Sequence, residues 1–215
     1  MSNFDLSDAR ALTSSQLVTA PDALQPHFKW NVQVPLDWMY LVTDPERTQA
    51  SVEGIVTDLF GTNTLDSEKR AEIVSSLSDT ALKAQKNKLL FTFIFPVQLE
   101  ANSLATCMLF LRWHNFAPTN PTMQLADNAF GSKLDYQHRL SRNGVEYASF
   151  SQQIKHSETA AKPSMWNHQT FTPVPRSTWA CLVAGSTPVE QLSKAMQHIV
   201  IRMTESLRFF PDVPA

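Results

Sequence analysis

Few residues in this chain have the types and the spacing that catalysis requires. Tyr136 and His138 are two residues apart, and on a strand that spacing presents both side chains on one face. The pair is titratable and could line a small polar pocket, and the alternative is an exposed edge strand. His114 follows Trp113 at the end of an apolar run, a position where a functional or a structural histidine fits. We take His114, Tyr136 and His138 as candidate binding residues and name no catalytic residue.

Two tryptophans complete the set of candidate binding residues. Trp166 and Trp179 lie in two runs that we expect to be neighbouring strands. These side chains could simply pack in the core, or they could form an exposed aromatic face that binds a protein partner, because Trp is enriched at interface anchors. A nucleic-acid stacking surface needs interleaved Lys and Arg, and here the basic residues are scattered. We therefore expect no nucleic-acid partner.

The motifs of the common enzyme classes are missing. The five glycines lie far apart, so the glycine-rich loops that hold nucleotide phosphates are absent, as is the G-x-S-x-G turn of a serine nucleophile. The six histidines include no pair with the i, i+4 spacing of a zinc helix, and two cysteines are too few for a structural zinc site. We expect no cofactor and no metal, and we favour a binding protein over an enzyme.

The composition is that of a globular protein. The chain has 215 residues, of which 43% are hydrophobic and 18% charged, and its net charge is −2. This length predicts one domain, which we place at residues 26–215, after a flexible N-terminal arm at residues 1–25. No apolar run is long enough to span a membrane, and the N-terminus lacks the pattern of an export signal, so we expect a cytoplasmic protein.

The first half of the chain alternates strand and helix patterns. Residues 28–34 have the period-two alternation of a half-buried strand, and a second short strand follows at residues 38–42. Helical spacing predicts helices at residues 44–61 and 66–87, the first opened by Asp44 and Pro45. Two apolar runs then predict a central hairpin, in which we expect deep burial of Phe91, Phe93, Met108 and Phe110.

The sequence of the second half of the chain predicts mostly strands, followed by a final helix. We predict a short strand within residues 127–136 and further strands at residues 145–154, 166–172 and 178–184. Thr187 and Glu190 have the spacing of a capping box, with Pro188 at the first helical position, so we expect the last helix to begin there. A short strand at residues 206–210 ends the domain. The fold class is therefore α+β, an antiparallel sheet with helices packed on its faces.

The order of these elements resembles the PsbP-like family, which includes the extrinsic photosystem II protein, a yeast Ran-binding import protein and many actinobacterial proteins. The resemblance rests on the turn Val34-Pro35-Leu36-Asp37-Trp38, on the helix at residues 70–84 that leads into residues 89–95, and on the segment from residue 174 to the last helix and Phe209. It covers residues 28–210, and the two helices after Asp44 resemble the actinobacterial members. The resemblance implies a PsbP-like sheet-and-helix layout and no shared catalytic residues.

These observations favour a non-catalytic binding or protein-interaction module. The alternatives are a small-ligand carrier with a pocket between sheet and helices, and an enzyme whose site is assembled from isolated residues such as His114, Tyr136 and His138. The partner is accordingly an unidentified protein or a small ligand.

Overall fold

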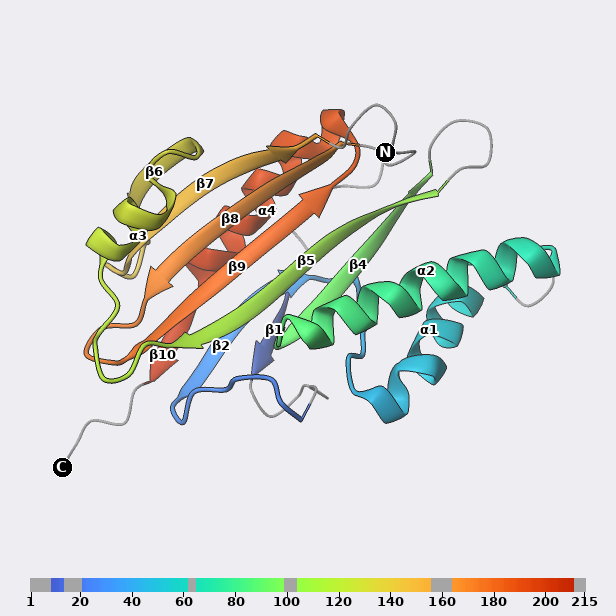
Figure 1. Ribbon diagram of the computed structural model, residues 1–215, viewed down its shortest axis with the longest axis horizontal. Coiled ribbons are helices and arrows are strands. Elements are labelled where there is room, and N and C mark those ends of the chain that lie inside the picture. The colour runs from blue at the N-terminus through green and yellow to red at the C-terminus, as the bar shows by residue number, and fades with distance from the viewer. Residues whose placement is uncertain (1–8, 14–20, 62–64, 99–103, 156–163, 211–215) are drawn as a thin grey trace.

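Seven antiparallel strands form the central layer of the structure, a computed structural model that describes residues 9–13, 21–61, 65–98, 104–155 and 164–210 (Figure 1). In sheet order the strands are β3 (Met39–Leu41), β4 (Phe91–Gln98), β5 (Leu104–Asn115), β9 (Trp179–Thr187), β8 (Met165–Pro173), β7 (Glu146–Ile154) and β6 (Leu134–Leu140). A second antiparallel sheet has the order β1 (Ala9–Thr13), β2 (Lys29–Pro35) and β10 (Arg208–Phe210). The predicted α+β class is confirmed, and the predicted strand at residues 28–34 belongs to this second sheet.

The predicted central hairpin is confirmed, but only two of the four residues expected to be deeply buried are so. β4 and β5 pair so that Phe93 lies opposite Leu109. Phe91 and Phe93 are fully buried, whereas Met108 and Phe110 are only half-buried. The reason is the register, because cross-strand partners share a face and the partners of the two phenylalanines are leucines of β5. Met108 and Phe110 therefore point to the opposite face of the sheet.

The main core lies between the large sheet and a layer made of β2 and the last helix, α4 (Ser193–Ser206), which lies behind β8 and β9 in Figure 1. Trp30 of β2 and Trp113 of β5 have ring centroids 5.8 Å apart in this core. The predicted apolar stripe of the last helix is confirmed, since its buried residues include Met196, Ile199, Val200 and Met203. β10 follows the helix as predicted.

The predicted start of that helix is wrong. Thr187 is the last residue of β9 and lies opposite Trp166, so its backbone belongs to the sheet. Its Oγ1 accepts from the backbone N–H of Val189 at 3.1 Å rather than from Glu190. A short 3-10 turn (Glu190–Leu192) follows, and α4 begins at Ser193 without a side-chain cap.

Two predicted helices cover the opposite face of the sheet at its β3 and β4 end. α1 (Pro45–Phe60) is capped by Asp44, whose carboxylate accepts from the N–H of Glu46, and α2 (Ser67–Lys86) is capped by Asp66. Both predicted helices and the predicted cap of Asp44 are confirmed, and the cap of Asp66 is an additional finding. Their apolar residues form a second cluster with the sheet that contains Leu41, Val52, Ile55, Val56, Leu77, Ala81 and Ile94.

A third helix replaces part of a predicted strand. Residues 123–130 form α3 (Met123–Phe130), and the strand β6 starts only at Leu134. Ala126 of α3 is fully buried against Ala148 and Phe171 of the sheet, and the ring of Phe130 stacks on Phe150 with centroids 4.3 Å apart. This packing on the sheet stabilises a helix of eight residues, which local propensity alone supports poorly.

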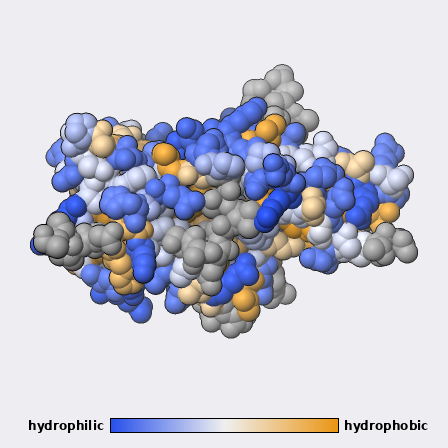
Figure 2. All heavy atoms as spheres, turned by 90° about the horizontal axis from the view of Figure 1, so that it is seen from below, coloured by the Kyte–Doolittle hydropathy of each residue, from blue (hydrophilic) through white to orange (hydrophobic). Residues whose placement is uncertain are grey.

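The N-terminal segment contributes one strand. β1 pairs antiparallel with β2, with Ala11 opposite Gln33. The rest of the predicted arm includes residues 1–8 and 14–20, which lie outside the described residues, so the flexible arm and the division at residue 26 stay predictions. No helix in the described ranges is long and apolar enough to cross a membrane. Seen from below, the surface is largely hydrophilic, with hydrophobic residues in small separate patches (Figure 2).

Candidate functional site

The described helices leave one face of the large sheet partly uncovered between α2 and α3. On this face β5 presents Phe110, Arg112 and His114, which lie opposite Ala184, Leu182 and Ala180 of β9. Among the described elements, no helix crosses β5 and β9 on the side that faces the viewer in Figure 1. Phe110 and Leu182 are half-buried, and neither packs in the three apolar clusters of the described residues. We call Phe110, Arg112, His114 and Leu182 the open-face site.

Arg112 is the unusual residue of the open-face site. It is half-buried, its Nε is enclosed, and no described residue accepts a hydrogen bond from that atom. No carboxylate of the described residues lies within ion-pair distance of it. Buried polar groups in native proteins almost always have partners, so the Nε of Arg112 is a donor without the acceptor that its position calls for.

His114 lies two residues from Arg112 on the same face. Burial lowers the pKa of His114, and the positive charge of Arg112 lowers it further. Both effects disfavour the imidazolium, so His114 is neutral at pH 7. Its ring lies near Phe116, with centroids 6.1 Å apart. The site therefore combines one permanent cation, one neutral titratable ring and apolar neighbours.

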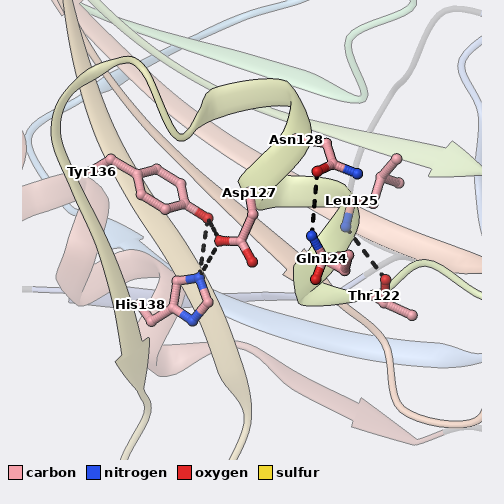
Figure 3. Close-up of polar contacts among 7 residues, drawn as sticks. All are labelled: Thr122, Gln124, Leu125, Asp127, Asn128, Tyr136 and His138. Atoms are coloured by element: carbon pink, nitrogen blue, oxygen red, sulfur yellow. Dashed lines mark hydrogen bonds and ion pairs between the residues drawn. The ribbon is translucent and has the colours of Figure 1, made fainter.

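A second polar cluster lies where α3 meets the edge strand β6 (Figure 3). The hydroxyl of Tyr136 donates to Oδ1 of Asp127 at 2.7 Å, and Nε2 of His138 lies 2.5 Å from the same oxygen. Tyr136 and His138 thus meet as strand spacing predicted, while the carboxylate that joins them comes from α3. Sequence reasoning missed Asp127 because it placed this residue on a strand.

The hydrogen bonds of this second cluster set the protonation of its members. Desolvation raises the pKa of Tyr136, and the hydrogen bond to Asp127 raises it further, so the phenol stays protonated. Hydrogen bonds from Tyr136 and then from His138 lower the pKa of Asp127. Asp127 orients His138 with Nδ1 pointing away from the cluster (Figure 3). No serine, threonine or cysteine of the described residues hydrogen-bonds to His138, so the pair lacks the nucleophile that a triad needs.

The structure does not bring all the predicted site residues together. His114 on β5 and His138 on β6 are separated by four strand spacings, or about 19 Å. Trp166 and Trp179 lie on neighbouring strands as predicted, but Trp166 pairs with Thr187 and Trp179 with Asn115, at opposite ends of β9. Trp179 is buried in the main core, so the two tryptophans form no shared aromatic face.

Sequence reasoning also missed Arg112. The signal was present in the apolar run at residues 104–113, where Arg112 and His114 alternate with the buried Leu111 and Trp113. A charged residue at an alternate position of a central strand indicates that one face of that strand is open or carries a partner.

A buried histidine forms a third polar cluster on the core side of the sheet. His168 Nδ1 lies 2.8 Å from Oγ of Ser151, and its Nε2 lies 2.9 Å from Oγ of Ser193. Both ring nitrogens therefore have partners, and the histidine ties β7 and β8 to the start of α4. Among the described residues, no group of His, Cys, Asp and Glu side chains is placed to hold a metal ion.

Comparison with known proteins yields a distant structural likeness. No family model and no curated protein matches the sequence. The fold is similar to the crystal structure of LpqN, a protein involved in cell envelope biogenesis of Mycobacterium tuberculosis, with 10% sequence identity and a TM-score of 0.45. The match covers 95% of this chain and 92% of that chain. At this level of similarity the likeness carries no argument about function.

Proposed function

We propose that this protein is a non-catalytic binding protein whose ligand is a small amphiphilic carboxylate, bound at the open-face site. The observation that carries the proposal is the enclosed Nε of Arg112, which lacks an acceptor among the described residues. The same proposal includes a cytoplasmic location and a PsbP-like layout. That family shares no catalytic residues.

The energetics of Arg112 favour an anionic ligand. Leaving an enclosed N–H without an acceptor costs about 1–3 kcal/mol, and a ligand that supplies the acceptor recovers this energy. The guanidinium fork matches a carboxylate through two parallel N–H···O bonds. The lowered pKa of His114 also supports an anionic ligand, because a neutral imidazole leaves Arg112 as the charge that selects the ligand.

The neighbours of Arg112 favour an apolar body on that ligand. Phe110 lies two residues away on the same face, and Leu182 lies directly opposite on β9. Cross-strand partners have Cβ atoms about 5 Å apart, so one ligand can contact the guanidinium and both apolar side chains. A small ion without an apolar part would leave Phe110 and Leu182 uncovered.

Calorimetric titration of the full chain with decanoate tests the proposal. We expect saturable binding of decanoate, with decanol and acetate binding at least about tenfold more weakly because each lacks one half of the ligand. Arg112→Met should weaken decanoate binding at least about tenfold, because the loss of even one of the two charge-assisted hydrogen bonds is worth that much. Arg142→Met, at an exposed position beyond β6, is the matched control and should bind like the wild type. Equal affinity of Arg112→Met and wild type would refute the proposal.

His114 provides an independent readout of where the ligand binds. A carboxylate at Arg112 stabilises the imidazolium form, so decanoate should raise the pKa of His114 in an NMR titration. His198, which is exposed on α4, should not respond. A ligand that shifts neither histidine binds elsewhere and contradicts the assignment of the site.

A further inference from the structure

Thr92 is a second buried polar residue without a partner on the face of the large sheet that carries the open-face site. The residue is fully buried, and its Oγ1 has no hydrogen-bond partner among the described residues. Thr92 lies opposite Phe110 in the pairing of β4 with β5, so the two side chains share a face. Valine would fill the same space without a hydroxyl, so packing alone does not explain a threonine at this position.

Thr92 lies at the border between the covered and the uncovered part of this face. Its partner on β3 is Leu41, which packs with residues of α1 and α2 in the second apolar cluster. Its partner on β5 is Phe110, which is half-buried and belongs to the open-face site. Because directly opposite side chains have Cβ atoms about 5 Å apart, a ligand that covers Phe110 comes to lie beside the hydroxyl of Thr92.

The position of Thr92 relative to Arg112 indicates where on the ligand a polar group would meet this hydroxyl. Thr92 is level with Phe110, and Arg112 is two residues farther along β5, so Thr92 and Arg112 are diagonal neighbours. Diagonal neighbours on one face of an antiparallel pair are about 7–8 Å apart. Hydrogen bonds of about 2.8 Å to each residue occupy much of that separation. The carboxylate of the ligand and the group that meets Thr92 are therefore only a few bonds apart.

We propose that the ligand of the open-face site is a 3-hydroxy carboxylic acid with an apolar chain, and that Thr92 recognises its hydroxyl. The inference rests on the proposed function, because the carboxylate must bind at Arg112. A hydroxyl can donate and accept, as can that of Thr92, so the two can pair in either direction. An ammonium group on the same carbon would lie near the positive charge of Arg112, which disfavours it. Thr92 is thus the residue that selects a hydroxylated chain over a plain one.

Calorimetric titration of the full chain with three acids of equal chain length tests the inference. We expect the tighter-binding enantiomer of 3-hydroxydecanoate to bind at least about fivefold more tightly than decanoate, because it adds one hydrogen bond to an unpaired buried group. 10-Hydroxydecanoate has the same atoms with the hydroxyl at the far end of the chain, and should bind no more tightly than decanoate. Equal affinities for 3-hydroxydecanoate and 10-hydroxydecanoate overturn the inference.

Two matched valine variants assign the preference to one hydroxyl. Thr92→Val should lose the preference for 3-hydroxydecanoate over decanoate, so that the ratio of the two affinities falls to about one. Thr172→Val is the control, because Thr172 is also buried with an unpaired Oγ1 but lies opposite Cys181 of the main core. This control should keep the preference of the wild type. A Thr92→Val variant that keeps it as well contradicts the role of Thr92.

Thermal unfolding of the same variants separates recognition from folding. Both valine variants should be at least as stable as the wild type, because each removes a buried hydroxyl that has no partner. A marked loss of stability in Thr92→Val alone would show that its hydroxyl is paired within the chain, which overturns the inference. Failure of decanoate itself to bind counts against the proposed function. Saturable decanoate binding without a preference for 3-hydroxydecanoate overturns only the present inference.

Discussion

Gly185 on β9 is the point where the sheet and α4 come closest, and we expect Gly185→Ala to destabilise the protein. A Cβ at this position would lie 2.5 Å from Sδ of Met196 and 2.8 Å from Cγ2 of Val200. Both distances are shorter than van der Waals contact, and both neighbours are buried in the main core. The backbone of Gly185 does not have a positive φ, so steric overlap rather than backbone strain decides the outcome.

The magnitude follows from which neighbour can move. Met196 has a flexible side chain that can rotate away, whereas Val200 is β-branched and has one strongly preferred rotamer on a helix. Overpacking of a core costs about 1–3 kcal/mol, and replacing glycine in a strand recovers about 0.5–1 kcal/mol of unfolded-state entropy. We therefore expect Gly185→Ala to lower the free energy of unfolding by about 1–2 kcal/mol.

Urea unfolding monitored by tryptophan fluorescence measures this change. Gly54→Ala is the matched control, because Gly54 lies exposed within α1 with nothing near its missing Cβ. That change should raise stability by about 0.5–1 kcal/mol. Combining Gly185→Ala with Val200→Ala should give a double-mutant coupling of at least about 0.5 kcal/mol in the relieving direction. A Gly185→Ala variant as stable as the wild type, or a cycle without coupling, would refute the packing argument.

Two further predictions concern titratable groups. Burial lowers the pKa of His168 below its ordinary 6.5 despite the opposing charge of Asp135, so below pH 6.5 the unfolded chain binds a proton that the folded chain does not. The free energy of unfolding should therefore fall as the pH drops from 6.5 towards the folded-state pKa. In urea unfolding, His168→Gln should make the free energy of unfolding depend less steeply on pH over this range. An unchanged pH dependence in the variant contradicts the assignment. Tyr136→Phe removes the hydrogen bond from Tyr136, which is the largest cause of the lowered pKa of Asp127. In an NMR titration of the variant, the carboxyl resonance of Asp127 should give a pKa closer to the ordinary 3.8. An unshifted titration would show that the hydrogen bond between Tyr136 and Asp127 is absent in solution.

The helices that sequence predicted well are those with local boundary signals. Asp44 and Asp66 cap helices within three residues of their own position, so neighbouring residues were enough to place α1 and α2. Thr187 carries the same kind of local signal, yet it ends a strand. Its pairing with Trp166, which lies 21 residues earlier in the chain, outweighed the cap. Local propensity predicts an element only where no stronger long-range pairing competes for the same residues.

The two candidate sites also differ in how far local sequence could predict them. The alternation along β6 was enough to predict that Tyr136 and His138 share a face, because strand periodicity is local. Asp127 joins them only through the packing of α3 on the sheet, since propensity does not specify a helix this short. The open-face site depends on tertiary structure still more, because Arg112 faces outward only once β5 takes its registers with β4 and β9 and no described helix covers that face. The sequence by itself determined most of the strands and helices, with α3 and β1 as exceptions. The tertiary structure decided which of their faces remain open, because long-range strand pairing alone fixes what lies opposite each side chain.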